Sequence, residues 1–185
     1  MQRLLDLPDP GERGAPRYAQ RPLPSYRYVP GLQPHPTRDP RGHSYQPQPT
    51  LNRHAPWDPA AWRTLDTWRY GVDLFNRFYF WEAHEAWEGL WAAVERETAP
   101  SLLLQGLIQI AAALLKAHMQ VPLGVHTLSA QGLEKLQRAR ATAPRLMGLD
   151  LTVVIDDFTA YFAPTGRGEL SPIDAGVPML MFAER

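Results

Sequence analysis

The sequence predicts an all-α protein: about five helices in an antiparallel, bundle-like array with a buried central helix, preceded by a proline-rich extended leader. Three observations support this fold. Apolar residues recur at spacings of three and four along most of residues 57–164. Residues 101–119 are apolar nearly all round, which is typical of a helix buried on most sides. Thirteen of the nineteen prolines lie within the first 59 residues, where they exclude regular helix.

The chain is expected to divide into a leader (1–56), a helical domain (57–164) and a tail (165–185) that packs back on the domain. Each proline in the leader removes a backbone donor and restricts the preceding residue, so extended backbone is favoured there. A disordered tail and a docked segment are both open interpretations of the leader. Aromatic residues are sparse in disordered segments, and this favours docking of residues 22–50.

The leader contains two kinds of side chain that bear on docking and chemistry. Tyr26, Tyr28 and Tyr45 are the expected anchors on the domain surface. His35, Asp39 and His43 have the types of side chain that bind metals. Their proline and glycine neighbours instead favour solvated loop positions.

The first helix is expected to start at Asp58-Pro59, with Asp as N-cap and Pro at the first helical position. Its apolar face consists of Trp62, Leu65, Trp68, Val72 and Phe75. Residues 76–78 look like a tight corner. A second helix then runs to about Glu95.

Thr98 and Pro100 are expected to start the central helix over residues 101–119. Its apolar run is interrupted by Gln105 and Gln109 and is too short to span a bilayer, so it indicates a core helix. The two glutamines are four residues apart and share a face. Gly106 beside them would let a neighbouring backbone come close.

Two further helices complete the predicted domain. Pro122 ends the central helix and begins the next, which has an apolar stripe to about Ala141. Asp150 is the predicted N-cap of the last helix, which reaches about Phe162. No stretch has a convincing strand pattern.

Composition excludes several classes of protein. Nineteen basic residues balance nineteen acidic ones, whereas nucleic-acid and anionic-membrane binders draw affinity from clustered positive charge. We therefore expect neither partner. The chain has no cysteine, which excludes disulfides, thiolate catalysis and cysteine-ligated metals and is compatible with a cytoplasmic protein.

The predicted site lies in residues 74–91, which hold three of the six tryptophans and three of the six phenylalanines. On a helix, Glu88 lies about 40° and Trp91 about 20° around the axis from His84. Trp81, Trp87 and Trp91 are the predicted aromatic wall of this face. Polar groups on an apolar face need partners, which leaves protein, metal or substrate as the candidates.

Two motifs in the chain resemble those of a known family. The chain carries H-x-x-x-E-x-x-W from His84 to Trp91, and then Q-G-L-I-Q from Gln105 to Gln109. Over roughly residues 60–140 it resembles the bacterial and archaeal family called domain of unknown function 309. The resemblance implies a small all-helical fold and a motif suspected of metal binding, with no established activity. Phe78 departs from the glycine expected in the family's corner, and phenylalanine tolerates positive φ poorly.

The site has two interpretations. In the first, His84 and Glu88 bind a divalent ion such as zinc, manganese or iron, and Glu85 is the general base. The third ligand is open among His118, His126 and Glu85. In the second, Glu88 orients His84, and a buried polar network is completed by Gln105, Gln109 and His118.

These interpretations correspond to two function classes. One is a metal-assisted enzyme, expected to be hydrolytic, which needs a third ligand and a water-accessible cavity. The other is a helical interaction module, which needs an exposed apolar groove. Metal-free catalysis or ligand binding is a further alternative, and the small-molecule or protein partner and the oligomeric state are left open.

Overall fold

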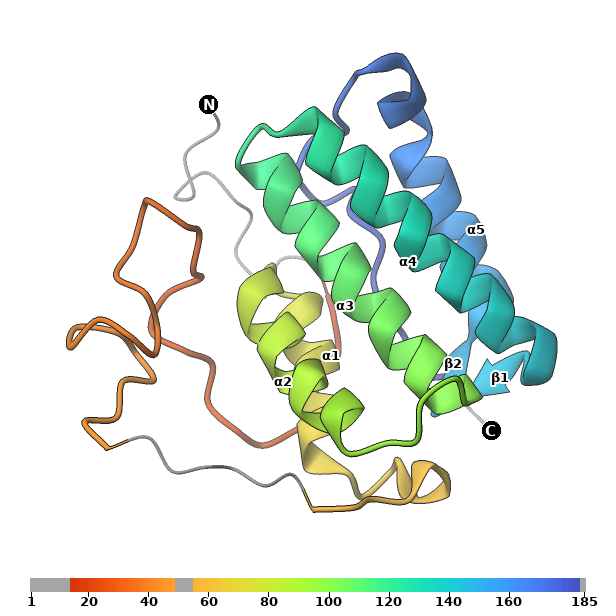
Figure 1. Cartoon of the computed structure of the whole chain (residues 1–185), viewed down its shortest axis with the longest axis horizontal. Helices are drawn as coiled ribbons and strands as arrows, with labels where there is room; N and C mark the ends of the chain where they lie inside the picture. The colour runs from red at the N-terminus through yellow and green to blue at the C-terminus, as the bar shows by residue number, and fades with distance from the viewer. Residues whose placement is uncertain (1–13, 49–54, 184–185) are drawn as a thin grey trace.

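The computed structural model describes residues 14–48 and 55–183 and contains the predicted all-α array (Figure 1). Its five α-helices are α1 (Asp66–Phe75), α2 (Phe80–Ala92), α3 (Ala99–His118), α4 (Pro122–Thr142) and α5 (Leu151–Phe162). The central helix α3 packs against α2 on one side and α4 on the other, and α5 packs against α4. The predicted fold class and the buried central helix are therefore confirmed.

The contact between α3 and α4 is close because two glycines face each other. A methyl group added at Gly106 would lie 2.8 Å from Cγ of Leu136 and 3.0 Å from the carbonyl oxygen of Gly132. Such distances leave no room for a side chain, so the role predicted for Gly106 is confirmed. In the described part of the chain, α3 alone is long and apolar enough to cross a membrane, and 61% of its apolar window is buried inside the protein.

The first predicted helix is interrupted. Asp58 does cap a turn, since its side chain accepts from the backbone N–H of Ala60, but the turn is a 3-10 helix, η2 (Pro59–Ala61). The backbone then leaves helical geometry at Leu65, with φ −78° and ψ 89°, before α1 begins. The break allows Trp62 to pack against Phe182 from the tail, with ring centroids 4.8 Å apart, and against Gly148. Tertiary packing has overridden the local signal for one continuous helix.

The corner between α1 and α2 turns at Phe78, which has φ 66°. This left-handed conformation costs roughly 1–2 kcal/mol for a residue with a side chain. The ring is only 3% exposed and lies 5.9 Å from the ring of Phe80. Burial of the aromatic ring offsets the backbone strain that glycine would avoid.

A two-stranded hairpin, which was not predicted, precedes α5. Strand β1 (Arg145–Leu146) pairs antiparallel with β2 (Leu149–Asp150). The turn residues Met147 and Gly148 both have positive φ, as tight hairpin turns require. Strands of two residues are too short to show apolar alternation. The carboxylate of Asp150 then accepts from Thr152 N at 3.0 Å and caps α5 as predicted, and η3 (Ala163–Arg167) follows.

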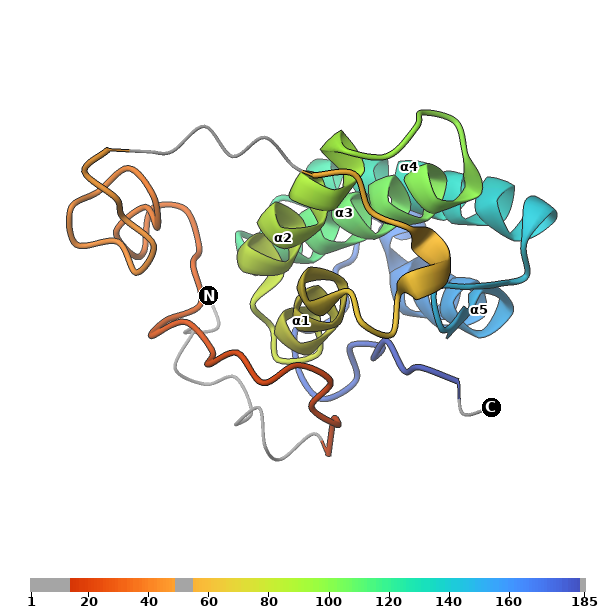
Figure 2. The ribbon, with the colours of Figure 1, turned by 90° about the horizontal axis from the view of Figure 1, so that it is seen from below.

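The leader and the C-terminal segment both pass beside α1 (Figure 2). Asp73 on α1 is fully buried and accepts from the backbone N–H groups of Tyr18 and Ala19, each at 2.8 Å. Asn76 exchanges two hydrogen bonds of 2.8 Å with the backbone of Leu180. One end of α1 therefore holds two segments that are far apart in the sequence.

Candidate functional site

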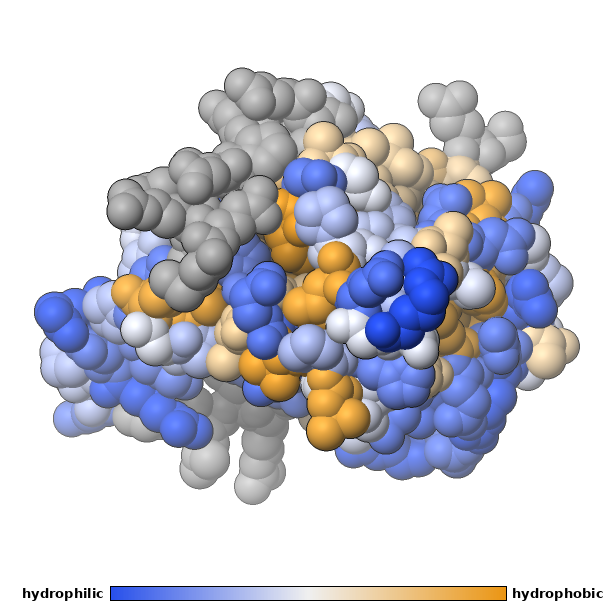
Figure 3. All heavy atoms as spheres, turned by 90° about the horizontal axis from the view of Figure 1, so that it is seen from above, coloured by the Kyte–Doolittle hydropathy of each residue, from blue (hydrophilic) through white to orange (hydrophobic). Residues whose placement is uncertain are grey.

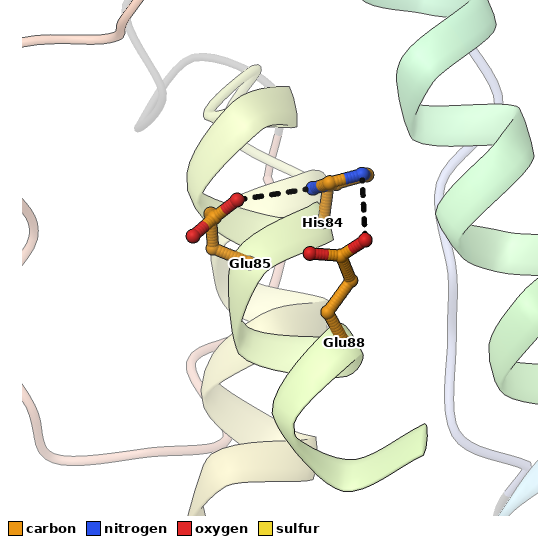
Figure 4. Close-up of side chains that lie close together, drawn as sticks. All are labelled: His84, Glu85 and Glu88. Atoms are coloured by element: carbon orange, nitrogen blue, oxygen red, sulfur yellow. Dashed lines mark ion pairs between the residues drawn. The ribbon is translucent and has the colours of Figure 1, made fainter. Parts of the chain in front are cut away.

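The predicted His–Glu pair lies on the outer face of α2 (Figure 4). His84 Nε2 is 3.5 Å from a carboxylate oxygen of Glu88, and His84 Nδ1 is 3.5 Å from one of Glu85. Both are ion-pair distances rather than short hydrogen bonds. The imidazole lies between two carboxylates, one beside each ring nitrogen.

This group is only partly buried, which corrects the expected buried network. The side chains of His84, Glu85 and Glu88 are 25%, 44% and 48% exposed. Water therefore satisfies the carboxylates, and no second helix needs to supply them with partners.

The glutamines of α3 do not complete the site. Gln109 donates to Gln131 of α4 at 3.2 Å, because α3 turns this side chain toward α4 and not toward α2. Within residues 14–48 and 55–183, no hydrogen bond joins Gln105 or Gln109 to His84 or Glu88. The predicted connection between the two motifs is therefore not formed.

His118 and His126 lie elsewhere as well. Among the described residues, one group of three histidine and acidic side chains is close enough to share one ion: His84, Glu85 and Glu88, whose donor atoms lie within 4.8 Å of one another. His118 lines a separate cavity of about 80 Å³ with residues of the C-terminal segment, and burial lowers its pKa. His126 is exposed on α4.

The three tryptophans of the predicted wall face different surroundings. Trp87 is fully buried in the core, where Gly71 of α1 makes room for its indole. Trp91 is partly exposed, and the guanidinium of Arg96 lies 3.5 Å from its ring centroid. Trp81 packs against the leader, with its ring 5.2 Å from that of Tyr28.

A second ionisable pair lies on the leader side of α2. Glu82 is buried, and its Oε1 accepts from the backbone N–H of Tyr28 at 2.9 Å. The same oxygen lies 3.0 Å from Nε2 of His43, and each of the two side chains is 5% exposed. The expectation that His43 is a solvated loop residue is wrong, because the leader folds over α2 and carries this imidazole inward.

Burial perturbs both members of this pair. Burial away from water raises the pKa of Glu82 to about 7, although the hydrogen bond from Tyr28 acts to lower this pKa. Burial also lowers the pKa of His43. Titratable groups whose surroundings shift the pKa strongly are concentrated at functional sites.

The pair lies at the wall of a cavity of about 710 Å³. Leader residues, the segment around Trp57 and the adjoining faces of α1 and α2 enclose it. Glu85 also lines this cavity, so it borders both the cavity and the exposed group around His84. The size is typical of small-molecule sites.

Sequence reasoning missed Glu82 and His43, but one signal for the cavity is present. Glu82, Ala86 and Gly89 follow one another at helical spacing, and all three line the cavity. A carboxylate followed by two small residues leaves a hollow along a helix face. No local signal identifies His43, because its partner is 39 residues away.

The fold and these groups define a small all-helical domain with ionisable side chains gathered on its second helix. Residues 68–128 match the family model described as "Domain of unknown function (DUF309)", which confirms the resemblance from α1 to the start of α4. No curated protein and no solved structure matches the chain. The matched segment includes Glu82 and the group around His84, whereas His43 lies outside it.

Proposed function

We propose that the protein binds a divalent metal ion through Nε2 of His84 and the carboxylate of Glu88, and that the bound ion assists hydrolysis. The observation that carries the proposal is the 3.5 Å separation of these two donor atoms. Two donors about 2.1 Å from one tetrahedral ion are about 3.4 Å apart. The pair therefore matches the spacing of two ligands on one ion without rearrangement.

Glu85 supports this assignment from the other side of the ring. Histidines that bind metals usually donate their second N–H to a carboxylate, which fixes the tautomer and the ring orientation. Glu85 lies beside Nδ1 at 3.5 Å and fits that role. Because it also lines the cavity, Glu85 is our candidate for the base that accepts a proton from water.

The donor set indicates which ions fit. One imidazole and one carboxylate suit zinc, manganese or iron, and with few protein ligands the ion would keep several waters. A divalent ion of this kind lowers the pKa of a bound water. Affinity should be modest, because zinc sites normally use at least three protein ligands. We place this activity in the cytoplasm, in keeping with the cysteine-free composition.

The alternative, an interaction module, lacks a specific observation in its favour. The exposed large apolar side chains of the described residues lie in four places: in the leader (Leu32, Tyr45), at the start of α4 (Val121, Leu123), on α5 (Val153) and in the C-terminal segment (Met181). Figure 3 shows the face seen from above, where hydrophobic residues form several separate areas between hydrophilic ones. An extended apolar groove is what an interaction module would need.

Isothermal titration of chelator-treated protein with Mn²⁺ and Zn²⁺ tests the proposal. We expect saturable binding of one ion per chain, which His84→Ala abolishes and Glu88→Gln weakens. His126→Ala, an exposed histidine on α4, is the matched control and should bind as the parent does. Retention of the parent's metal binding by His84→Ala would refute this site.

A further inference from the structure

We propose that the cavity between the leader and helices α1 and α2 binds a small, flat organic cation, such as an aryl amidine, through the carboxylate of Glu82. This site is centred on Glu82 and shares only Glu85 with the exposed group around His84. It uses side chains from the leader as well as from the domain.

Glu82 lacks a donor on one of its oxygens. Oε1 already receives the N–H of Tyr28 and faces Nε2 of His43. Oε2 is buried and has no hydrogen-bond partner among the described residues. A buried acceptor without a donor is costly, so an N–H group from a ligand would remove that cost. Glu82 lines the cavity, so a small turn of its side chain would bring Oε2 to a ligand there.

The walls favour a planar, positively charged group. Trp57 and Trp81 supply aromatic surface, and aromatic faces attract cations. The guanidinium of Arg21 already lies 4.2 Å from the ring centroid of Tyr70, at the wall of the same cavity. The planar guanidinium of Arg21 therefore covers the face of Tyr70. The amidinium group of a ligand is also planar and carries the same charge.

The leader makes this site possible. Pro24, Thr37 and His43 contribute to the lining, so α1 and α2 alone would leave the cavity open on one side. The hydroxyl of Tyr79 donates to the carbonyl of Pro24 at 3.1 Å and holds this part of the leader in place. A volume of about 710 Å³ accommodates a one- or two-ring molecule.

Titration with benzamidine, followed by tryptophan fluorescence and calorimetry, tests the proposal on the full chain. We expect saturable binding with one site per chain and a change in indole emission from Trp57 and Trp81. Benzyl alcohol, which has the ring without the charge, should bind about tenfold or more weakly, because it lacks the charge-assisted hydrogen bond.

Two variants remove the site in different ways. Glu82→Gln keeps the shape and the acceptor for Tyr28 but loses the charge, so benzamidine affinity should fall about tenfold or more. Ala86→Leu narrows the cavity from α2 next to Glu82 and keeps the carboxylate, so it should weaken binding about tenfold or more while far-ultraviolet circular dichroism stays unchanged. Glu134→Gln, an exposed carboxylate on α4, is the control for charge loss.

The outcomes separate cleanly. Weaker binding in both Glu82→Gln and Ala86→Leu, with Glu134→Gln equal to the parent, supports the site. Equal binding of benzamidine and benzyl alcohol, or unchanged binding in a folded Ala86→Leu protein, overturns it. If Glu82→Gln fails to fold, Ala86→Leu alone decides the question.

Discussion

His43 in the leader and Glu82 in α2 approach to 3.0 Å, from Nε2 to Oε1, with only 5% of each side chain exposed. This contact couples the proline-rich leader to the helix that carries both candidate sites. A free tail would leave His43 in water and would remove this contact. The contact therefore makes the stability of the domain depend on pH through two groups with opposite effects.

The first prediction concerns Glu82. Burial raises its pKa from 4.5 to about 7, so the folded protein holds a proton that the unfolded chain releases. The stability from this group is present below about pH 4.5 and is lost as the pH rises through 7. The difference in unfolding free energy between the parent and Glu82→Gln should fall by on the order of 3 kcal/mol across that window. Urea unfolding at several pH values measures it.

His43 supplies the control for this experiment. Burial lowers its pKa from 6.5, so its contribution is present above pH 6.5 and is lost as the pH falls through the folded value. Of this pair, only His43 titrates in Glu82→Gln. The variant should therefore lose stability as the pH falls. Adding His43→Gln to this variant should remove the part of the pH dependence that His43 contributes. A parent-to-variant difference that does not change with pH contradicts the burial of Glu82.

The second prediction concerns the leader as a whole. Deleting residues 1–50 removes three backbone N–H groups that donate to Asp73 and Glu82, and each hydrogen bond to a charged group contributes about 1.5–3 kcal/mol. The melting temperature should fall by on the order of 10 °C. Tyr45→Ala is the control, because Tyr45 is exposed and was wrongly expected to be an anchor. A truncated protein that melts with the parent would mean that the leader is not docked.

Local signals predicted the parts of the fold that local interactions determine. Thr98 and Asp150 each accept from backbone N–H groups at the start of a helix, so their sequence positions are sufficient to locate α3 and α5. Gly106 lies in an otherwise apolar helix, and a close helix contact is the ordinary reason for such a glycine. These features need no knowledge of the rest of the chain.

The remaining features depend on partners distant in sequence. The break before α1 follows from packing of Trp62 on Phe182, and no pattern near Trp62 reveals it. His84 and Glu88 were correctly placed together by helical spacing, but their exposure depends on which face of α2 the leader and α3 cover. His43 is buried only because its proline-rich neighbours fold over Glu82. Local composition alone therefore led to the wrong prediction that His43 is solvated.

The third prediction tests the contact between α3 and α4. Gly106→Ala places a methyl group 2.8 Å from Leu136 and 3.0 Å from the backbone of Gly132, so the helices have to separate. Overpacking of this kind costs about 1–3 kcal/mol, against a gain of roughly 1 kcal/mol in helix propensity. We expect a net loss in denaturant unfolding. Gly166→Ala has no atom within 4 Å of the added methyl group and should be neutral. Equal stability of both variants would argue against the close helix contact.

The last prediction concerns the end of α3, where Gln120 has φ 59°. Gln120 N donates to Ala117 O and Val121 N donates to Lys116 O, each at 3.0 Å. These two bonds form the Schellman motif, in which the residue at φ > 0 is usually glycine. Gln120→Gly relieves a left-handed strain of about 1–2 kcal/mol but loses the side-chain hydrogen bond to Ala117 O, worth about 1 kcal/mol. Gln120→Ala loses the same hydrogen bond and keeps the strain. In thermal unfolding, the glycine variant should therefore melt above the alanine variant and at or above the parent. If alanine equals or exceeds glycine, Gln120 does not have the left-handed conformation.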